Sequence, residues 1–250
     1  MQDHILYTIR WDGRNARPYL YGSTLKYMED GSVIFENELL PPGAVVNEWT
    51  SFTDFQRDRR EPQLPILKEK QSYRIQMHCW VYPEKTLLWK IDFFDAREEK
   101  LDFKIFDTFR GEFTVPEHTY FYKISLIQAG SQKLRFYWFD LTESEETFFE
   151  ELQQKTEDLS EVNVLIPQIR GAAAILSGEY PERNYANATA FSPGILMYPQ
   201  WDQRQILQKR LAGAKRICFW GRGASGRALA EKFAEMIPDH QAEKRFMIDE

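Results

Sequence analysis

Residues 73–140 alternate apolar and polar side chains with a period of two, which is typical of half-buried β-strands. Residues 73–82 and 87–94 both show this pattern and are separated by a turn at Pro83-Glu84-Lys85, so we expect them to form an antiparallel hairpin. Leu101, Phe103 and Ile105 continue the apolar series, and residues 120–126 and 135–140 form two further strands. Many short strands separated by turns predict a mainly β protein with an antiparallel β-sandwich.

A helical pattern replaces the alternation after Leu141. Thr142 and Glu145 have the spacing of a capping box, and apolar residues then lie near one helical face amid acidic residues. Within residues 160–200 we expect an irregular connector that contains a short strand at 162–169 and a helical turn at 172–176. The predicted domains are a β-sandwich over 1–142, a helix and connector over 143–200, and a partial α/β segment over 201–250.

The last segment contains a glycine pattern of the form GxGxxG. Gly221, Gly223 and Gly226 follow a predicted strand at 216–220 and open a predicted helix at 227–236, after a first helix at 203–211. In nucleotide-binding folds such glycines allow a tight turn, the approach of a pyrophosphate and close helix packing. A second strand ends at Asp249, where these folds carry an acidic residue.

We therefore expect a small Rossmann-like segment, with nucleotide as its candidate cofactor. Its amino-acid sequence is similar to the nucleotide-fold segments attached to sugar-modifying and glycan-transfer enzymes. The two predicted strands are fewer than a doubly wound sheet needs, so either the protein continues past Glu250 or the segment is a trimmed relic packed on the β domain.

Charge and composition exclude several classes of function. A net charge of −6 argues against a nucleic-acid partner, because phosphate recognition requires concentrated Lys and Arg. Cys79 and Cys218 lie far apart within apolar runs, so we expect two buried thiols rather than a disulfide framework or a zinc site. The first residues lack the pattern of a signal peptide and no apolar run is long enough to span a membrane, which predicts a cytoplasmic protein.

No catalytic or metal-binding constellation emerges from the sequence. Ser225 stands in the sequence Gly-Ala-Ser-Gly-Arg, which lacks the second glycine of a nucleophile elbow. The four histidines are scattered, so they indicate neither a triad nor a metal cluster. The carboxylates of a predicted strand and its turn are interpreted as a solvated edge rather than a glycosidase pair; they are Asp92, Asp95, Glu98 and Glu99.

A carbohydrate site is the more credible binding chemistry. His78, Trp80 and Tyr82 lie on the otherwise polar face of their predicted strand, beside Arg74 and Gln76. Exposed aromatic rings can stack on the apolar faces of sugars while polar neighbours bind the hydroxyls. The alternative is that this face packs against the connector or the C-terminal half.

The stretch from Leu39 to Leu67 predicts a surface segment. Its four prolines exclude a helix interior and a central strand, and its aromatic residues pass close to an arginine cluster at 57–60. This composition favours a binding or assembly surface. The alternative is that Trp49, Phe52 and Phe55 only pin a long connection onto the β core.

Several motifs in one order resemble a known family. The motifs are Gly31-Ser-Val-Ile-Phe35, LLPPG from Leu39, Trp49-Thr50-Ser51, Phe55-Gln56, Arg59-Arg60, Leu64-Pro-Ile-Leu67, Phe113-Thr-Val-Pro-Glu117 and Tyr120-Phe-Tyr-Lys-Ile124. In this order they resemble the third accessory secretory protein of the bacterial accessory Sec system, over roughly residues 19 to 142.

The resemblance implies a cytosolic, non-catalytic component that aids the export of serine-rich-repeat glycoprotein adhesins in Gram-positive bacteria, with a carbohydrate-binding-module-like sandwich. Its implied partners are the sister accessory Sec proteins, the glycosylated adhesin and the motor ATPase of the system. An alternative from another class is the glycan-binding N-terminal part of a sugar-nucleotide-linked enzyme with a C-terminal Rossmann-like domain.

Overall fold

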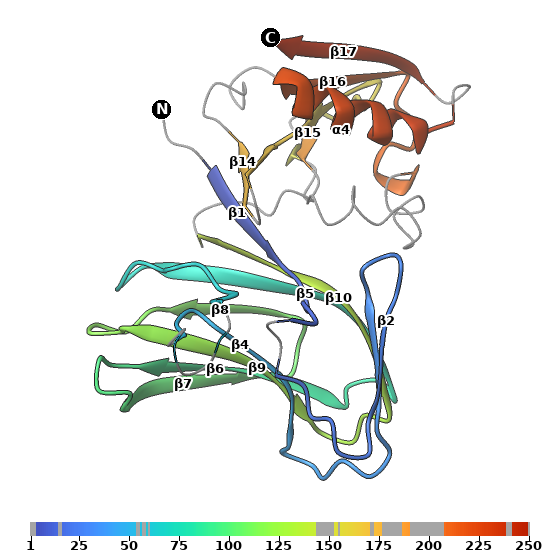
Figure 1. Cartoon of the computed structure of the whole chain (residues 1–250). Coiled ribbons are helices and arrows are strands. Elements are labelled where there is room, and N and C mark those ends of the chain that lie inside the picture. The colour runs from blue at the N-terminus through green and yellow to red at the C-terminus, as the bar shows by residue number, and fades with distance from the viewer. Residues whose placement is uncertain are drawn as a thin grey trace. The chain divides into compact units, whose positions relative to one another are not determined.

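The chain forms two compact units in a computed structural model (Figure 1). We call residues 9–145 the sandwich unit and residues 1–8 with 146–250 the α/β unit. The structure describes residues 4–14, 17–53, 56, 59, 61–143, 153–154, 156–170, 173–176, 187–190, 208–238 and 242–249. No helix among these residues is long and apolar enough to cross a membrane.

Two antiparallel sheets form the layers of the sandwich unit (Figure 1). The first sheet has the order β2 (Thr24–Tyr27), β3 (Val33–Glu36), β10 (Lys133–Glu143), β5 (Ser72–Tyr82) and β8 (Arg110–Thr114). The second sheet has the order β4 (Val45–Thr50), β9 (Phe121–Gln128), β6 (Leu87–Phe94) and β7 (Lys100–Phe106). The predicted antiparallel β-sandwich is confirmed.

Aromatic side chains fill the space between the two layers. Trp49 of β4 is fully buried, and its ring centroid lies 5.2 Å from Phe136 and 5.3 Å from Phe139 of β10. Its indole Nε1 donates a hydrogen bond of 2.8 Å to the carbonyl oxygen of Arg10. Trp49 is therefore a core residue with a satisfied polar group, as expected for a buried indole, rather than a surface anchor.

The proline-rich stretch around Trp49 contains the edge strand β4 and then folds back on its end. The backbone N–H groups of Gln63 and Leu64 both donate to the carbonyl oxygen of Thr50, and the Tyr122 hydroxyl donates to the carbonyl oxygen of Pro65 at 2.9 Å. For Trp49, the interpretation that the aromatic residue pins this stretch to the core is the correct one. Phe55 and the arginines at 57 and 60 lie outside the described residues.

The predicted hairpin between residues 73–82 and 87–94 is wrong. β5 pairs with β10 and β8 in the first sheet, whereas β6 pairs with β9 and β7 in the second. The chain therefore crosses from one layer to the other after Tyr82. Alternation fixes which side chains face the core, but it does not say which sheet a strand joins.

The α/β unit contains a mainly parallel sheet that the sequence predicted only in part. Its strand order is β11 (Gln153–Gln154), β15 (Asn187–Ala190), β12 (Glu161–Leu165), β16 (Arg216–Arg222) and β17 (Glu243–Asp249). All neighbours except β11 and β15 are parallel. Helix α4 (Gly223–Glu235) connects β16 to β17, so the predicted strand, helix and strand are confirmed, and β12 and β15 raise the number of parallel strands above the expected two.

A small antiparallel group completes this unit. β13 (Gln168–Arg170) pairs with β14 (Ala173–Leu176), which pairs with β1 (His4–Ile9). Leu6, Leu165 and Trp220 belong to one apolar cluster together with Ala174, Leu176 and Ala190. The predicted helical turn at 172–176 is therefore wrong from Ala173 onward, because these residues pair with two strands whose positions the local sequence does not reveal.

The predicted helix start at Thr142 is also wrong. Thr142 and Glu143 belong to β10 and lie opposite Arg74 and Tyr73 of β5. The tertiary pairing thus overrides the capping-box pattern. Residues 144–152 of that predicted helix lie outside the described residues, and its extension to Leu159 is wrong, because Gln153 and Gln154 form β11 and residues 156–159 are not helical. Residues 203–207 of the next predicted helix also lie outside the described residues, whereas 208–210 are helical.

Candidate functional site

Two aromatic side chains form an exposed platform on the outer face of β5. Trp80 is 49% exposed and Tyr82 is 55% exposed. Their ring centroids are 6.3 Å apart and their planes differ by only 16°. We call this pair the aromatic platform. Because its rings are nearly parallel and open to solvent, it can stack on a flat apolar ligand surface.

Charged groups lie beside the aromatic platform because of the strand register. Trp80 is directly opposite Arg135 of β10, and Tyr82 is opposite Lys133. Lys133 in turn lies opposite Glu36 of β3, and their side chains form an ion pair of 2.5 Å. Side chains directly opposite in an antiparallel sheet share one face. The platform is therefore bordered by hydrogen-bond donors and an acceptor.

Arg135 is held in place by groups from the turn before β3. Its Nε donates to the Ser32 hydroxyl at 3.0 Å, and its Nη2 donates to Asp30 Oδ2 at 2.5 Å. Burial alone would raise the pKa of Asp30, but hydrogen bonds from Ser32 and the charge of Arg135 outweigh it and lower this pKa. Asp30 thus stays ionised and fixes the guanidinium beside Trp80.

His78 does not join the aromatic platform. It is only 5% exposed, stacks on Trp138 with ring centroids 4.5 Å apart, and its Nε2 lies 3.1 Å from Asp140 Oδ2. The indole Nε1 of Trp138 donates to the same carboxylate oxygen at 3.2 Å. His78 therefore satisfies a buried polar cluster, although alternation alone placed it on the same face as Trp80.

The glycine motif lies at the carboxyl end of β16. Gly221 is still in the strand, opposite Ile248, and Gly226 is buried in the first turn of α4. A Cβ on either glycine would lie 3.3–3.4 Å from backbone atoms of the other. These two glycines thus permit the close packing of α4 on its strand, which is the role expected of Gly226, whereas Gly221 was expected to form a tight turn and is still part of β16.

Gly223 has a different environment. Its φ is +60°, and a Cβ there would meet nothing within 4 Å. The first turn of α4 contains no acidic residue, and the preceding Arg222 makes no side-chain capping hydrogen bond. The strand register places Asp249 opposite Arg222, so the backbone positions of all four predicted cofactor residues come together at this end of the sheet.

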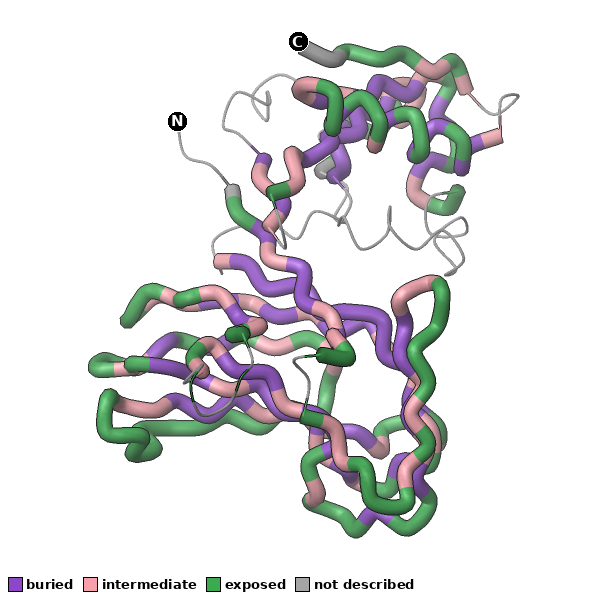
Figure 2. The backbone as a smooth tube through the Cα atoms, in the orientation of Figure 1, coloured by how far each residue is buried: buried purple, intermediate pink, exposed green. Residues whose placement is uncertain are grey.

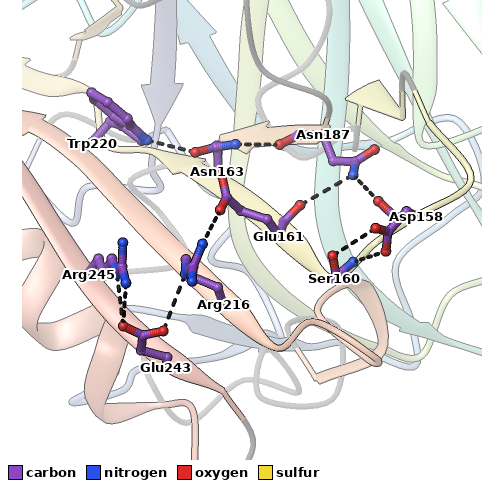
Figure 3. Close-up of polar contacts among 9 residues, drawn as sticks. All are labelled: Asp158, Ser160, Glu161, Asn163, Asn187, Arg216, Trp220, Glu243 and Arg245. Atoms are coloured by element: carbon purple, nitrogen blue, oxygen red, sulfur yellow. Dashed lines mark hydrogen bonds and ion pairs between the residues drawn. The ribbon is translucent and has the colours of Figure 1, made fainter.

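Polar side chains link the parallel strands along their length (Figure 3), and Glu161, Arg216 and Glu243 lie at the amino ends of β12, β16 and β17. Arg216 bonds to Glu161 at 3.0 Å and to Glu243 at 3.3 Å, and these bonds raise the pKa of its guanidinium. Buried Asn163 accepts a hydrogen bond from Trp220 Nε1 at 2.8 Å and donates to the carbonyl oxygen of Asn187. These contacts fix the strand register, and they reach the residue before Gly221 through Trp220.

The carboxylates that the sequence raised as candidates make local contacts in the structure. The described residues contain no group of three or more His, Cys, Asp or Glu side chains that could hold a metal ion. Asp92, which the sequence placed on a solvated edge, is buried and lies 2.8 Å from both Lys90 and Lys100. Asp95 accepts backbone hydrogen bonds from Arg97 and Glu99 within a turn. These carboxylates have structural roles.

An antiparallel sandwich of two sheets, with two exposed aromatic rings on one strand, places residues 9–145 among the β-sandwich modules. Residues 18–143, nearly the whole sandwich unit, match the family described as "Accessory Sec secretory system ASP3". This chain belongs to that family.

Individual relatives support the assignment. "Accessory Sec system protein Asp3" of Streptococcus gordonii is 40% identical over 77 residues, which cover 31% of this chain and 48% of the relative. The matched region thus spans about half the length of that relative. A chain of the crystal structure of accessory secretory proteins 1, 2 and 3 of Streptococcus pneumoniae is 38% identical, with a TM-score of 0.53, over 55% of this chain and 95% of the other.

A further similarity extends beyond the sandwich unit. A chain in the Glycosylation Associate Protein (Gap123) complex of Streptococcus agalactiae covers 96% of this chain and 78% of its own length, with 21% identity and a TM-score of 0.57. At this identity the similarity concerns the fold alone.

The residues around Trp80 were incompletely predicted from sequence, because the positions of Arg135, Lys133 and Glu36 follow from register rather than from a local motif.

Proposed function

We propose that this chain is a cytoplasmic, non-catalytic component of the accessory Sec export machinery that works in a complex with sister accessory proteins. The observation that carries the proposal is the family match over residues 18–143, which covers nearly the whole sandwich unit. One structural relative comes from a crystal structure of accessory secretory proteins 1, 2 and 3, and the other comes from a Glycosylation Associate Protein complex. The cargo would be the glycosylated serine-rich-repeat adhesin, delivered toward the motor ATPase of the system.

The aromatic platform would supply glycan recognition within this function. Trp80 and Tyr82 can stack on the apolar face of a pyranose, while Arg135 and Lys133 donate to hydroxyl oxygens and Glu36 accepts from a hydroxyl group. This arrangement suits a neutral sugar on a peptide, because charged and apolar contacts are both available on one flat face. N-acetylglucosamine and a glycosylated serine-rich peptide are the probes we would choose.

Titration of the full chain with these probes tests the glycan component. We expect a change in tryptophan fluorescence, because Trp80 is exposed whereas Trp11, Trp49, Trp89 and Trp138 are buried. Trp80→Ala should remove the response. Tyr120→Ala changes another exposed aromatic residue, directly before β9 of the second sheet, and is the control that should preserve the response. A flat titration of the wild type would contradict glycan binding and leave complex formation to be judged separately.

A second candidate function is nucleotide binding at the glycine motif, as in a sugar-nucleotide-linked enzyme. The observation that favours it is the strand order β15-β12-β16-β17. After β12 the chain first adds β15 on one side of β12 and then adds β16 on its other side, so the order of the strands reverses between β12 and β16. Ligands of open α/β sheets bind at the carboxyl ends of strands at such a reversal. The start of α4, with Gly223 open to solvent space, lies at this end.

Two matched substitutions test the nucleotide function. Gly223→Asn and Gly223→Asp have nearly the same shape, and both residue types tolerate a positive φ better than most. A carboxylate at this position would repel a phosphate, so binding of uridine diphosphate measured by calorimetry should survive in the Asn variant and weaken in the Asp variant. Absence of binding by the wild type would eliminate this candidate.

A further inference from the structure

Strand β7 is an edge strand with an unusually apolar exposed surface. Among the strands that the structure describes, only β6 pairs with it. Leu101, Phe103 and Ile105 are 41%, 52% and 52% exposed, and Figure 2 colours nearly the whole strand as exposed. The prediction that these three residues continue the strand series is confirmed, but their side chains are exposed rather than buried. Edge strands with such residues are sites at which another strand can add to the sheet.

The backbone of β7 offers hydrogen bonds at its outer edge. The N–H of Phe103 donates to Oδ1 of the adjacent Asp102 at 2.8 Å. In an antiparallel pair, successive residues direct their backbone groups alternately toward and away from the partner strand. The N–H of Phe103 is thus one of the groups that point away from β6, and Ile105 has the same orientation.

The charges of β7 favour one particular partner. In a two-fold antiparallel pairing of two β7 strands, residues that face the same side of the sheet lie opposite each other. A centre at Asp102 or at Lys104 would place like charges opposite each other. A centre at Phe103 instead places Asp102 of each copy opposite Lys104 of the other, and Leu101 opposite Ile105. The strand is therefore complementary to itself in this register.

We propose that two copies of this chain associate through antiparallel pairing of their β7 strands, centred on Phe103. The two four-stranded sheets would then form one continuous sheet. The N–H of each Phe103 would leave Asp102 and donate to the carbonyl oxygen of Phe103 in the other copy, and the released carboxylate would face Lys104. No polar group loses its partner in this exchange.

The expected dimer is weak, because pairing one short strand buries less area than the roughly 1,600 Å² that is typical of stable interfaces. Sedimentation of the full chain over a wide range of concentration should show a monomer and dimer in equilibrium. Lys104→Asp places like charges at both cross-strand positions and should raise the dissociation constant by about tenfold or more. The double variant D102K/K104D restores opposite charges and should regain the dimer.

A matched control separates this pairing from a general effect of charge. Lys26→Asp makes the same change on β2, the edge strand of the other sheet, and should leave the dimer intact. A wild type that stays monomeric at all concentrations overturns the proposal, as does an equal loss of dimer in Lys26→Asp and Lys104→Asp. If the β7 variants lose a sister accessory protein instead of the second copy, the edge serves a partner strand and self-association is wrong.

Discussion

At the scale of single residues, the aromatic platform depends on the ion pair between Asp30 and Arg135. Asp30 is nearly buried and receives hydrogen bonds from Ser32 and Arg135, and Arg135 lies opposite Trp80. The pKa of this carboxyl group is lowered because these bonds outweigh its burial. The pair thus links the stability of the sandwich unit to the geometry of the candidate glycan surface.

Asp30→Asn removes the charge while it preserves the shape of the side chain. We expect a loss of about 1.5–3 kcal/mol in the free energy of unfolding at pH 7, since hydrogen bonds to charged groups contribute about that much. A lowered folded-state pKa stabilises the protein above the unfolded value of about 3.9, and this contribution disappears as pH falls through the folded value. Urea unfolding should therefore show a smaller difference between wild type and variant near pH 3 than at pH 7. An equal difference at both pH values would contradict the assignment.

The two thiols should be nearly inert in the folded protein. Cys79 is half-buried as a residue, yet burial of its thiol raises its pKa to about 12, and burial also raises the pKa of Cys218. The thiolate is the reactive form, so we expect Ellman's reagent at pH 8 to react at least about a hundredfold more slowly than in urea. Reaction of both thiols at the unfolded rate would show that they are accessible.

At the scale of elements, the close approach of β8 to two stacked rings makes one glycine indispensable. Trp89 of β6 and Phe106 of β7 stack with centroids 4.0 Å apart. A Cβ on Gly111 of β8 would lie 2.6 Å from Phe106 and 2.7 Å from Trp89, which is well inside van der Waals contact. The absence of a side chain at Gly111 therefore allows this ring pair to pack.

Gly111→Ala should destabilise the sandwich unit by about 1–3 kcal/mol, the usual effect of inserting a methyl group into a packed site. Thermal or urea unfolding measures this change. The double variant G111A/F106L makes room for the methyl group and should recover part of the lost stability relative to Phe106→Leu alone. A neutral effect of Gly111→Ala would mean that the rings move aside at little cost.

The elements also show how far local sequence determines structure. Apart from His78, alternation correctly separated the more buried and more exposed faces of β5, and the glycine motif correctly predicted β16, α4 and β17. Local sequence did not predict which strands pair, because pairing depends on residues that are distant in the chain. The examples are the crossing after Tyr82, the extension of β10 through Thr142 and the strand at Ala173. For the site, alternation placed Trp80 and Tyr82 correctly but missed that Asp140 and Trp138 bury His78.

At the scale of the whole molecule, the two units have different candidate chemistry. The sandwich unit contains the family match, the aromatic platform and the β7 edge, whereas the α/β unit contains the glycine motif. Each function can therefore be removed by substitutions in one unit alone. Loss of glycan binding through Trp80→Ala should leave complex formation intact, since the folded core does not depend on that exposed ring.

Co-expression with the sister accessory proteins, followed by size-exclusion chromatography with light scattering, tests the central claim most directly. The account predicts that the wild-type chain elutes in a complex whose mass includes at least one sister protein, and that Trp80→Ala does the same. Circular dichroism of the purified chain confirms that it is folded. A folded chain that elutes without any of the sister proteins would contradict the claim that it is a component of this export machinery.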